Sequence, residues 1–175
     1  VTTPLTESNR ATVTGRPPMG TPVTDEATEV VVVKTPAIDV QKTARVTATD
    51  APINEGDTLP AGTKVTYSYA VTSNQGNDAL RVSKANNGGV TDTKCTPVTY
   101  VSGDTNSNNL LDLTETWTYE CTTRLLPSSQ DGTVRNVATA TGKWSNPDNK
   151  PQNNGDVTNT DDFTIKTSSV ANLRV

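Results

Sequence analysis

The sequence predicts an all-β fold in the form of a thin β-sandwich, and three observations lead to this prediction. Thr supplies 33 of the 175 residues and Val 20, whereas Leu supplies only 9, so the composition favours strands over helices. Short runs of alternating polar and apolar residues recur between clusters of Asn, Gly and Asp, which form turns. No window of the chain has a clear helical period.

The predicted strands follow one another from residue 37 onward. Alternation is clearest at 64–72, and weaker alternation predicts strands at 37–43, 80–83, 98–101, 116–122 and 134–141. The inward faces of these strands carry the aromatic residues that we expect in the core, namely Tyr67, Tyr69, Trp117 and Tyr119. In contrast, the composition of 145–162 predicts a polar loop or linker.

An internal repeat divides the chain. The segment "SNRATVTG" at 8–15 matches "RNVATATG" at 135–142 in five of eight positions, and "TDEATEVVVVKT" at 24–35 parallels "TDDFTIKT" at 160–167. The period of about 130 residues predicts one complete unit at 36–167. Residues 1–35 are then the closing strands of a preceding unit or a donor-strand tail, and 168–175 begin a following strand or a linker.

Composition and charge argue against several classes of function. The chain has no His and only two Cys, so the usual proton shuttle and the imidazole metal ligand are missing, and we predict that the protein is not an enzyme. The net charge is −4 and the Lys and Arg residues are scattered, which predicts no nucleic-acid partner. No apolar run approaches the roughly 18 residues that a membrane span requires.

The segment 104–115, "DTNSNNLLDLTE", has the oxygen-donor spacing of a twelve-residue calcium loop. Its ligand positions 1, 3, 5, 7, 9 and 12 are Asp104, Asn106, Asn108, the carbonyl of Leu110, Asp112 and Glu115. Position 6 is Asn109 in place of the usual Gly, and Asn tolerates the left-handed backbone of that turn. Because a strand pattern follows the loop, we predict Ca²⁺ in an inter-strand loop. The alternative is a solvated, Asn-rich loop without an ion.

The two cysteines, Cys95 and Cys121, flank this loop. In a chain with this composition they most simply form a disulfide, which predicts an extracellular protein. The alternative is a pair of buried free thiols. A redox role is disfavoured because the two residues are not spaced as C-x-x-C.

Strand parity also places a lysine and an asparagine toward the core. Lys42 alternates with Ile38 and Val40, and Asn136 alternates with Ala138 and Ala140. A buried amine loses its charge by desolvation and becomes nucleophilic.

In some surface-protein sandwiches a lysine, an asparagine and a nearby acid form a spontaneous amide crosslink, and the acid here would be Asp92 or Glu120. The simpler interpretation, which the sequence alone favours, has Lys42 extending to solvent and Asn136 bonding backbone groups.

The runs "AIDVQKT", "GTKVTYSYAVTSNQGNDALRVSKANNGGVTDTKC", "GDTNSNNLLDLTETWTYEC" and "NVATATG" resemble the tandem immunoglobulin-like repeats of prokaryotic cell-surface proteins, a conserved-repeat family. The resemblance covers about 36–142. It implies an extracellular immunoglobulin-like β-sandwich that serves as a building block of stalks or adhesins, usually in series. It implies no catalytic activity.

These features together predict a structural subunit of an extracellular filament, stalk or adhesin at the cell surface. A lone strand pair at 1–35 cannot bury its apolar face, so we expect it to add to the sheet of a neighbouring copy and give a linear homopolymer or tandem array. The residues expected at that contact are Asn9, Ala11, Val13, Val31 and Val33. The alternative is a glycan- or protein-binding adhesin module, for which an exposed Trp144 would offer a stacking surface.

Overall fold

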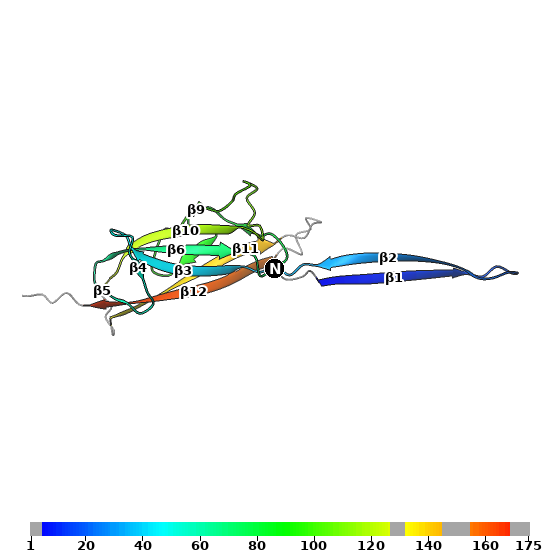
Figure 1. Ribbon diagram of the computed structural model, residues 1–175, viewed down its shortest axis with the longest axis horizontal. Coiled ribbons are helices and arrows are strands. Elements are labelled where there is room, and N and C mark those ends of the chain that lie inside the picture. The colour runs from blue at the N-terminus through cyan, green and yellow to red at the C-terminus, as the bar shows by residue number, and fades with distance from the viewer. Residues whose placement is uncertain (1–4, 127–131, 145–154, 169–175) are drawn as a thin grey trace, which may run out of the picture.

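The computed structural model describes residues 5–126, 132–144 and 155–168, and all regular elements in these ranges are strands. They form an elongated body and a two-stranded arm that projects from one end of it (Figure 1). The arm consists of β1 (Leu5–Gly15) and β2 (Val23–Val33). The body consists of β3 (Asp39–Val46), β4 (Pro52–Ile53), β5 (Thr58–Pro60), β6 (Lys64–Thr72), β7 (Arg81–Val82), β8 (Val90–Asp92), β9 (Thr99–Ser102), β10 (Thr116–Arg124), β11 (Thr133–Trp144) and β12 (Gly155–Ser168).

The body is built from two sheets. One has the strand order β4-β3-β6-β10-β9, and the other has the order β5-β12-β11-β7, with β8 also paired to β11. Alternating residues of both sheets meet in one apolar cluster, which contains Tyr67, Tyr69, Trp117 and Tyr119 with no exposed surface. The predicted all-β class and the predicted aromatic core are therefore confirmed, and the two packed sheets are consistent with a β-sandwich.

The prediction of a polar loop over 145–162 is wrong for its second half. Residues 155–162 belong to β12, which pairs with β11 along its whole length, whereas 145–154 lie outside the described residues. Cross-strand ion pairs compensate for the polar sequence of this strand: Arg135 pairs with Asp162, and Lys143 pairs with Asp156. Ser168 ends β12, so the element expected to begin at 168 lies almost wholly in 169–175, outside the described residues.

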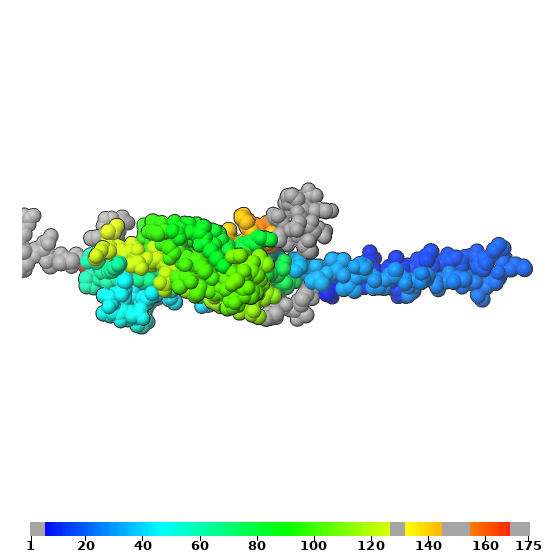
Figure 2. Space-filling model, turned by 90° about the horizontal axis from the view of Figure 1, so that it is seen from above, coloured from blue at the N-terminus to red at the C-terminus, as the bar shows by residue number. Residues whose placement is uncertain are grey.

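The arm is a regular antiparallel ribbon. Its register runs from Leu5 opposite Val33 to Gly15 opposite Val23, without a bulge. All side chains from residue 6 to residue 34 are exposed, on both faces and along both edges. The space-filling view shows the arm extending clear of the body as a narrow rod (Figure 2).

Asn77 joins the arm to the body. Its side-chain Nδ2 donates to the carbonyl of Val33 at 2.7 Å, and its Oδ1 accepts from the backbone N–H of Thr35 at 2.7 Å. A neighbouring ion pair links Lys34 to Asp78 at 2.9 Å. These bonds hold the last residues of the arm to the loop that follows β6, so the arm leaves the body in a defined direction.

The predicted disulfide is present between Cys95 and Cys121, whose Cα atoms are 5.9 Å apart. It joins the middle of β10 to the segment between β8 and β9. The closed loop spans 26 residues, for which the chain-entropy model gives a stabilisation of about 3.5 kcal/mol.

Candidate functional site

The arm has the same strand pattern as the closing hairpin of the body, which is formed by β11 and β12. The repeat at 8–15 lies on β1 and its counterpart at 135–142 lies on β11, while the later repeat segments lie mainly on β2 and β12. The two hairpins also agree in the parity of their pairing: Asn9 faces Glu29 across the arm, and Asn136 faces Phe163 across the body hairpin. The arm therefore resembles the closing hairpin in sequence and in strand parity, but its register differs by two residues, since the residue that corresponds to Phe163 is Val31 and not Glu29.

This resemblance identifies the face of the arm that corresponds to a core. On β11 the buried residues are Asn136, Ala138, Ala140 and Gly142, and on β12 they include Phe163 and Ile165. Their counterparts are the five residues predicted for an inter-subunit contact together with Gly15, and these share one face of the ribbon: Asn9, Ala11, Val13, Gly15, Val31 and Val33. We call this set the inner face of the arm.

The inner face of the arm is uncovered in the described residues. Val13 is 66% exposed and Val31 is 54% exposed, and the opposite face adds Val30 at 56% and Val32 at 49%. A two-stranded ribbon is marginally stable alone in water, because it has little core and open hydrogen-bonding edges. Glu7, Asp25 and Glu29 lie on the same face as Val13 and Val31, so this face is partly apolar and partly acidic. An uncovered ribbon with open edges and exposed valines is a typical site of strand addition.

The second candidate site lies inside the body, where Lys42 of β3, Asp92 of β8 and Asn136 of β11 meet. The Nζ of Lys42 is 2.8 Å from Oδ2 of Asp92 and 2.8 Å from the main-chain oxygen of Asn136. The side chains of Lys42 and Asp92 have no exposed surface, and Asn136 has none either. The expectation that Lys42 reaches solvent is therefore wrong, because β3 directs its side chain between the sheets.

Aromatic rings enclose this cluster. Nζ of Lys42 lies 4.6 Å from the ring centre of Tyr67 and 5.7 Å from that of Tyr69, whose hydroxyl donates to Asp92 at 2.7 Å. Burial raises the pKa of Tyr69, and its hydrogen bond to the Asp92 carboxyl adds to that rise. Of the two acids considered from the sequence, Asp92 is the one that pairs with Lys42. Glu120 instead forms an ion pair with Arg45 at 2.9 Å, and both of these side chains are partly exposed.

The predicted calcium loop brings several of its donor residues together. Nδ2 atoms of Asn106 and Asn108 both donate to Oδ2 of Asp112, at 2.8 and 2.9 Å. The carboxylate of Asp104 accepts from the backbone N–H of Asn108 at 3.2 Å. Asn109, at the position where such loops have Gly, has a φ of 61°, which is the left-handed conformation expected there.

A cation that the sequence gave no reason to expect also lies at this loop. The ammonium of Lys84 pairs with Asp104, bonds Oδ1 of Asn109 at 3.1 Å and lies 4.9 Å from the ring centre of Trp117. Lys84 is 20 residues before Asp104 in the chain, so no local motif connects the two. The Lys84 ammonium lowers the pKa of the Asp104 carboxyl below its usual value.

Glu115, the last predicted ligand, is held by donors of the protein. Its Oε1 accepts from the backbone and hydroxyl of Thr105, at 2.8 and 2.7 Å, and its Oε2 accepts from the Trp117 indole at 3.0 Å and from the Asp112 backbone at 3.4 Å. Burial alone would raise the pKa of Glu115, but these hydrogen bonds outweigh it and lower the pKa to about 2.

The structure leaves calcium binding open. Within the described residues no group of three or more His, Cys, Asp or Glu side chains is arranged to hold a metal ion. Three of the six predicted ligands are the side chains of Asn106 and Asn108 and the carbonyl of Leu110, and these oxygen donors do not belong to those four residue types. Calcium binding at 104–115 therefore stays a prediction.

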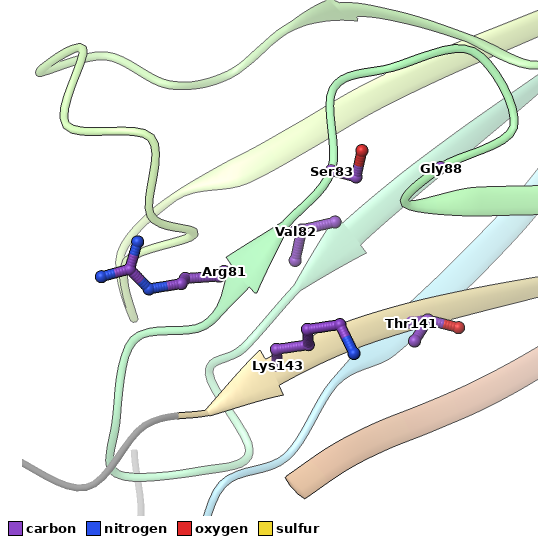
Figure 3. Close-up of a pocket in the computed structure, with 6 residues that line it drawn as sticks. All are labelled: Arg81, Val82, Ser83, Gly88, Thr141 and Lys143. Carbon is purple, nitrogen blue, oxygen red and sulfur yellow. The ribbon is translucent and has the colours of Figure 1, made fainter. Parts of the chain in front are cut away.

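A shallow hollow of about 190 Å³ lies beside β7 and β11 (Figure 3). Arg81, Val82, Ser83, Gly88, Thr141 and Lys143 line it, and none of these residues is aromatic. Trp144, considered for sugar stacking, is not part of the lining; it is half-buried and packs against the core. Neither feature favours a glycan site.

Comparison of the chain with protein-family models, with curated proteins and with solved structures gives no match. Among the described residues, no helix has the length and apolar character needed to cross a membrane.

Proposed function

We propose that this protein is a structural subunit of an extracellular filament, stalk or adhesin, in which successive copies are joined through the arm. The observation that carries the proposal is that a complete sandwich body bears a second, uncovered hairpin that resembles its own closing hairpin. The disulfide supports an oxidising compartment outside the cytoplasm.

The similarity of the two hairpins supports a second copy of this chain as the partner of the arm. In the body, the buried residues of β11 and β12 pack on the sheet that contains β3 and β6. The arm shares the strand alternation of this hairpin, and its open backbone edges are able to pair with β-structure of the same type.

The neighbouring copy receives the arm at a sheet edge, since its own β11 and β12 already cover the core. Of the four strands at the ends of the two sheet orders, β9 is the longest and has an open edge in the described residues. β9 also carries Val101, which is 52% exposed. Addition of β1 or β2 at such an edge satisfies backbone groups and covers apolar side chains together.

The test is sedimentation velocity over a range of concentrations. The full chain should form species larger than a monomer, and residues 36–175 should remain folded and monomeric. Within the full chain, the double variant V13D/V31D should lose association, because it replaces two apolar side chains by charges on a face that already carries Glu7, Asp25 and Glu29. The control variant T12D/T28D places the same charges on the opposite face and should retain most of the association. Association that survives removal of residues 1–35 contradicts the proposal.

Calcium is the second part of the proposal. Ca²⁺ bound by 104–115 would stiffen the connection between β9 and β10, and it would stabilise the folded body by roughly 2.7 kcal/mol at a hundredfold excess over the dissociation constant. Thermal unfolding with Ca²⁺ and with a chelator tests this. The melting temperature should fall on chelation in the wild type but not in D112N. An equal melting temperature in both conditions means that the loop has no calcium function.

A further inference from the structure

The interior of the body contains a cluster of potentially reactive polar side chains, which a purely architectural sandwich does not require. A buried lysine amine, a buried carboxylate and a buried carboxamide come together from three strands. We propose that Nζ of Lys42 and Cγ of Asn136 form an intramolecular amide bond with release of ammonia, and that Asp92 carries the proton during this step.

The first argument is the position of the amine. Nζ of Lys42 is in contact with Asn136 itself, through the main-chain oxygen at 2.8 Å, and it bonds Oδ2 of Asp92 at the same distance. Its side chain has no exposed surface, so water does not compete for it. Burial lowers the pKa of the Lys42 amine, although the hydrogen bond and charge of Asp92 oppose that shift. A neutral amine is the nucleophilic form.

The second argument is the state of the carboxamide. Oδ1 of Asn136 accepts two hydrogen bonds, from the hydroxyl of Thr93 at 3.1 Å and from the backbone N–H of Lys94 at 3.1 Å. Donors in this arrangement polarise a carbonyl and stabilise the oxyanion that forms when a nucleophile attacks its carbon. Nδ2 of Asn136, in contrast, is buried and makes no hydrogen bond of good geometry among the described residues. Its neighbour is the hydroxyl of Tyr67, whose pKa burial raises and the contact with Asn136 lowers. The group that would leave is therefore held less firmly than the carbonyl oxygen.

These groups share one short segment. Asp92 contacts the amine, and the next two residues, Thr93 and Lys94, hold the carbonyl oxygen of Asn136. Asp92 is fixed in turn, since its Oδ1 accepts from the backbone N–H groups of Lys94 and Cys95 at 2.9 Å each. Such preorganisation places the reacting groups together without further ordering of the chain.

The step balances without an added reagent. Starting from the ion pair of Lys42 and Asp92, the ammonium passes one proton to Asp92, and the neutral amine attacks Cγ of Asn136, so that the Nζ–Cγ bond forms. Asp92 then delivers this proton to Nδ2, and the Cγ–Nδ2 bond breaks. The departing ammonia takes up the second proton that Nζ loses and leaves as ammonium. Asp92 ends in its starting protonation state, no electron is gained or lost, and the chain becomes lighter by one ammonia, about 17 Da.

The product would join the two sheets covalently. Lys42 lies on β3 in one sheet and Asn136 on β11 in the other, at the level of Tyr67 and Tyr69 in the core. With the disulfide between Cys95 and Cys121, the body would then contain two covalent links between segments far apart in sequence. A unit that transmits tension along a filament benefits from such links because they prevent the sheets from separating.

Intact-mass spectrometry of the full chain, after reduction of the disulfide, tests the proposal. The expected mass is about 17 Da below that calculated from the sequence. Trypsin does not cleave at an acylated lysine, so digestion should yield a branched peptide that joins 35–45 to 136–143 through Lys42 and Asn136. A folded wild-type chain with the full calculated mass overturns the proposal. A deficit of 17 Da without the branched peptide also overturns it, since ring closure of an Asn to a succinimide gives the same mass change.

Matched variants assign the roles. K42R should have its full calculated mass, because an arginine side chain does not attack the amide, and N136A should have it because the electrophile is missing. D92N should be unreacted or react at least tenfold more slowly during incubation of freshly purified protein. The control K84R changes another lysine that pairs with a carboxylate and should keep the 17 Da deficit. A 17 Da deficit in K42R would contradict the assignment. The full calculated mass in folded K84R would contradict it too.

Discussion

The arm and the closing hairpin of the body share a sequence repeat and the parity of their strand pairing, yet they occupy opposite environments. Asn136 and Ile165 of the body hairpin are fully buried, whereas their counterparts Asn9 and Val33 lie on an uncovered ribbon. The alternation of residues determines which face of a ribbon is able to enter a core. It does not determine whether a core is present to receive it.

This contrast also explains why the same residue type has different chemistry in the two places. Asn136 accepts hydrogen bonds from Thr93 and Lys94, which belong to the segment after β8. Asn9 has the equivalent position on β1, but the strands that would surround it are missing from the arm. Whether the repeated asparagine is able to react therefore depends on the strands that pack around it.

The largest expected difference between the two hairpins is the loss of stability when an apolar side chain is shortened to alanine. I165A removes a fully buried side chain and should lower the free energy of unfolding of the body by about 2–5 kcal/mol. The equivalent arm variant V33A should leave the unfolding of the body almost unchanged and instead weaken association. Chemical denaturation and sedimentation velocity on the same samples measure the two effects. Equal destabilisation by both variants would show that the arm packs on its own body.

The second difference concerns the two asparagines. N136A leaves the hydroxyl of Thr93 without its acceptor, whereas the N–H of Lys94, which Asn136 shares with Asp92, keeps the Asp92 carboxylate. The loss should cost about 0.5–1.5 kcal/mol in addition to any loss of the crosslink. N9A removes an exposed side chain and should change the stability of the body by less than about 0.5 kcal/mol. If N136A unfolds at the same denaturant concentration as the wild type, the hydrogen bonds to its side chain do not contribute to stability.

The third difference is the response to acid, because the body contains a carboxylate with a strongly lowered pKa. The pKa of Glu115 is about 2 in the folded protein against an ordinary value of 4.5. A lowered folded pKa favours folding above the unfolded pKa, so this contribution is complete above about pH 4.5 and is lost as the pH falls toward 2. E115Q should show a shallower loss of stability over this range. An unchanged slope in E115Q would mean that other carboxylates carry the acid response.

The sequence alone was sufficient to predict the features that depend on alternation. The inward positions of Asn136 and the core aromatic residues follow from strand parity, and the inner face of the arm follows from the repeat. Parity also places Lys42 on an inward strand face, but the sequence favoured an ammonium that extends to solvent, which is wrong. The disulfide was predictable because only two cysteines are present. These predictions need no knowledge of which strands are neighbours in space.

The features that depend on tertiary neighbours were not predictable. The strand 155–162 has a loop-like composition, and its place in the sheet depends on pairing with β11 and on ion pairs with Arg135 and Lys143. The position of Lys84 over the 104–115 loop depends on the packing of two distant segments. Alternation already favoured Asp92, because Glu120 lies on the strand face opposite to Trp117 and Tyr119. The contact of Asp92 with Lys42 depends on the pairing of β8 with β11, which alternation does not reveal.

The central claim is that the arm joins one copy of the chain to the next, and electron microscopy of negatively stained protein tests it most directly. The full chain should form linear filaments without any added ligand, and residues 36–175 at the same concentration should give only separate particles. Separate particles from the full chain at all concentrations, or filaments from 36–175, would contradict the account.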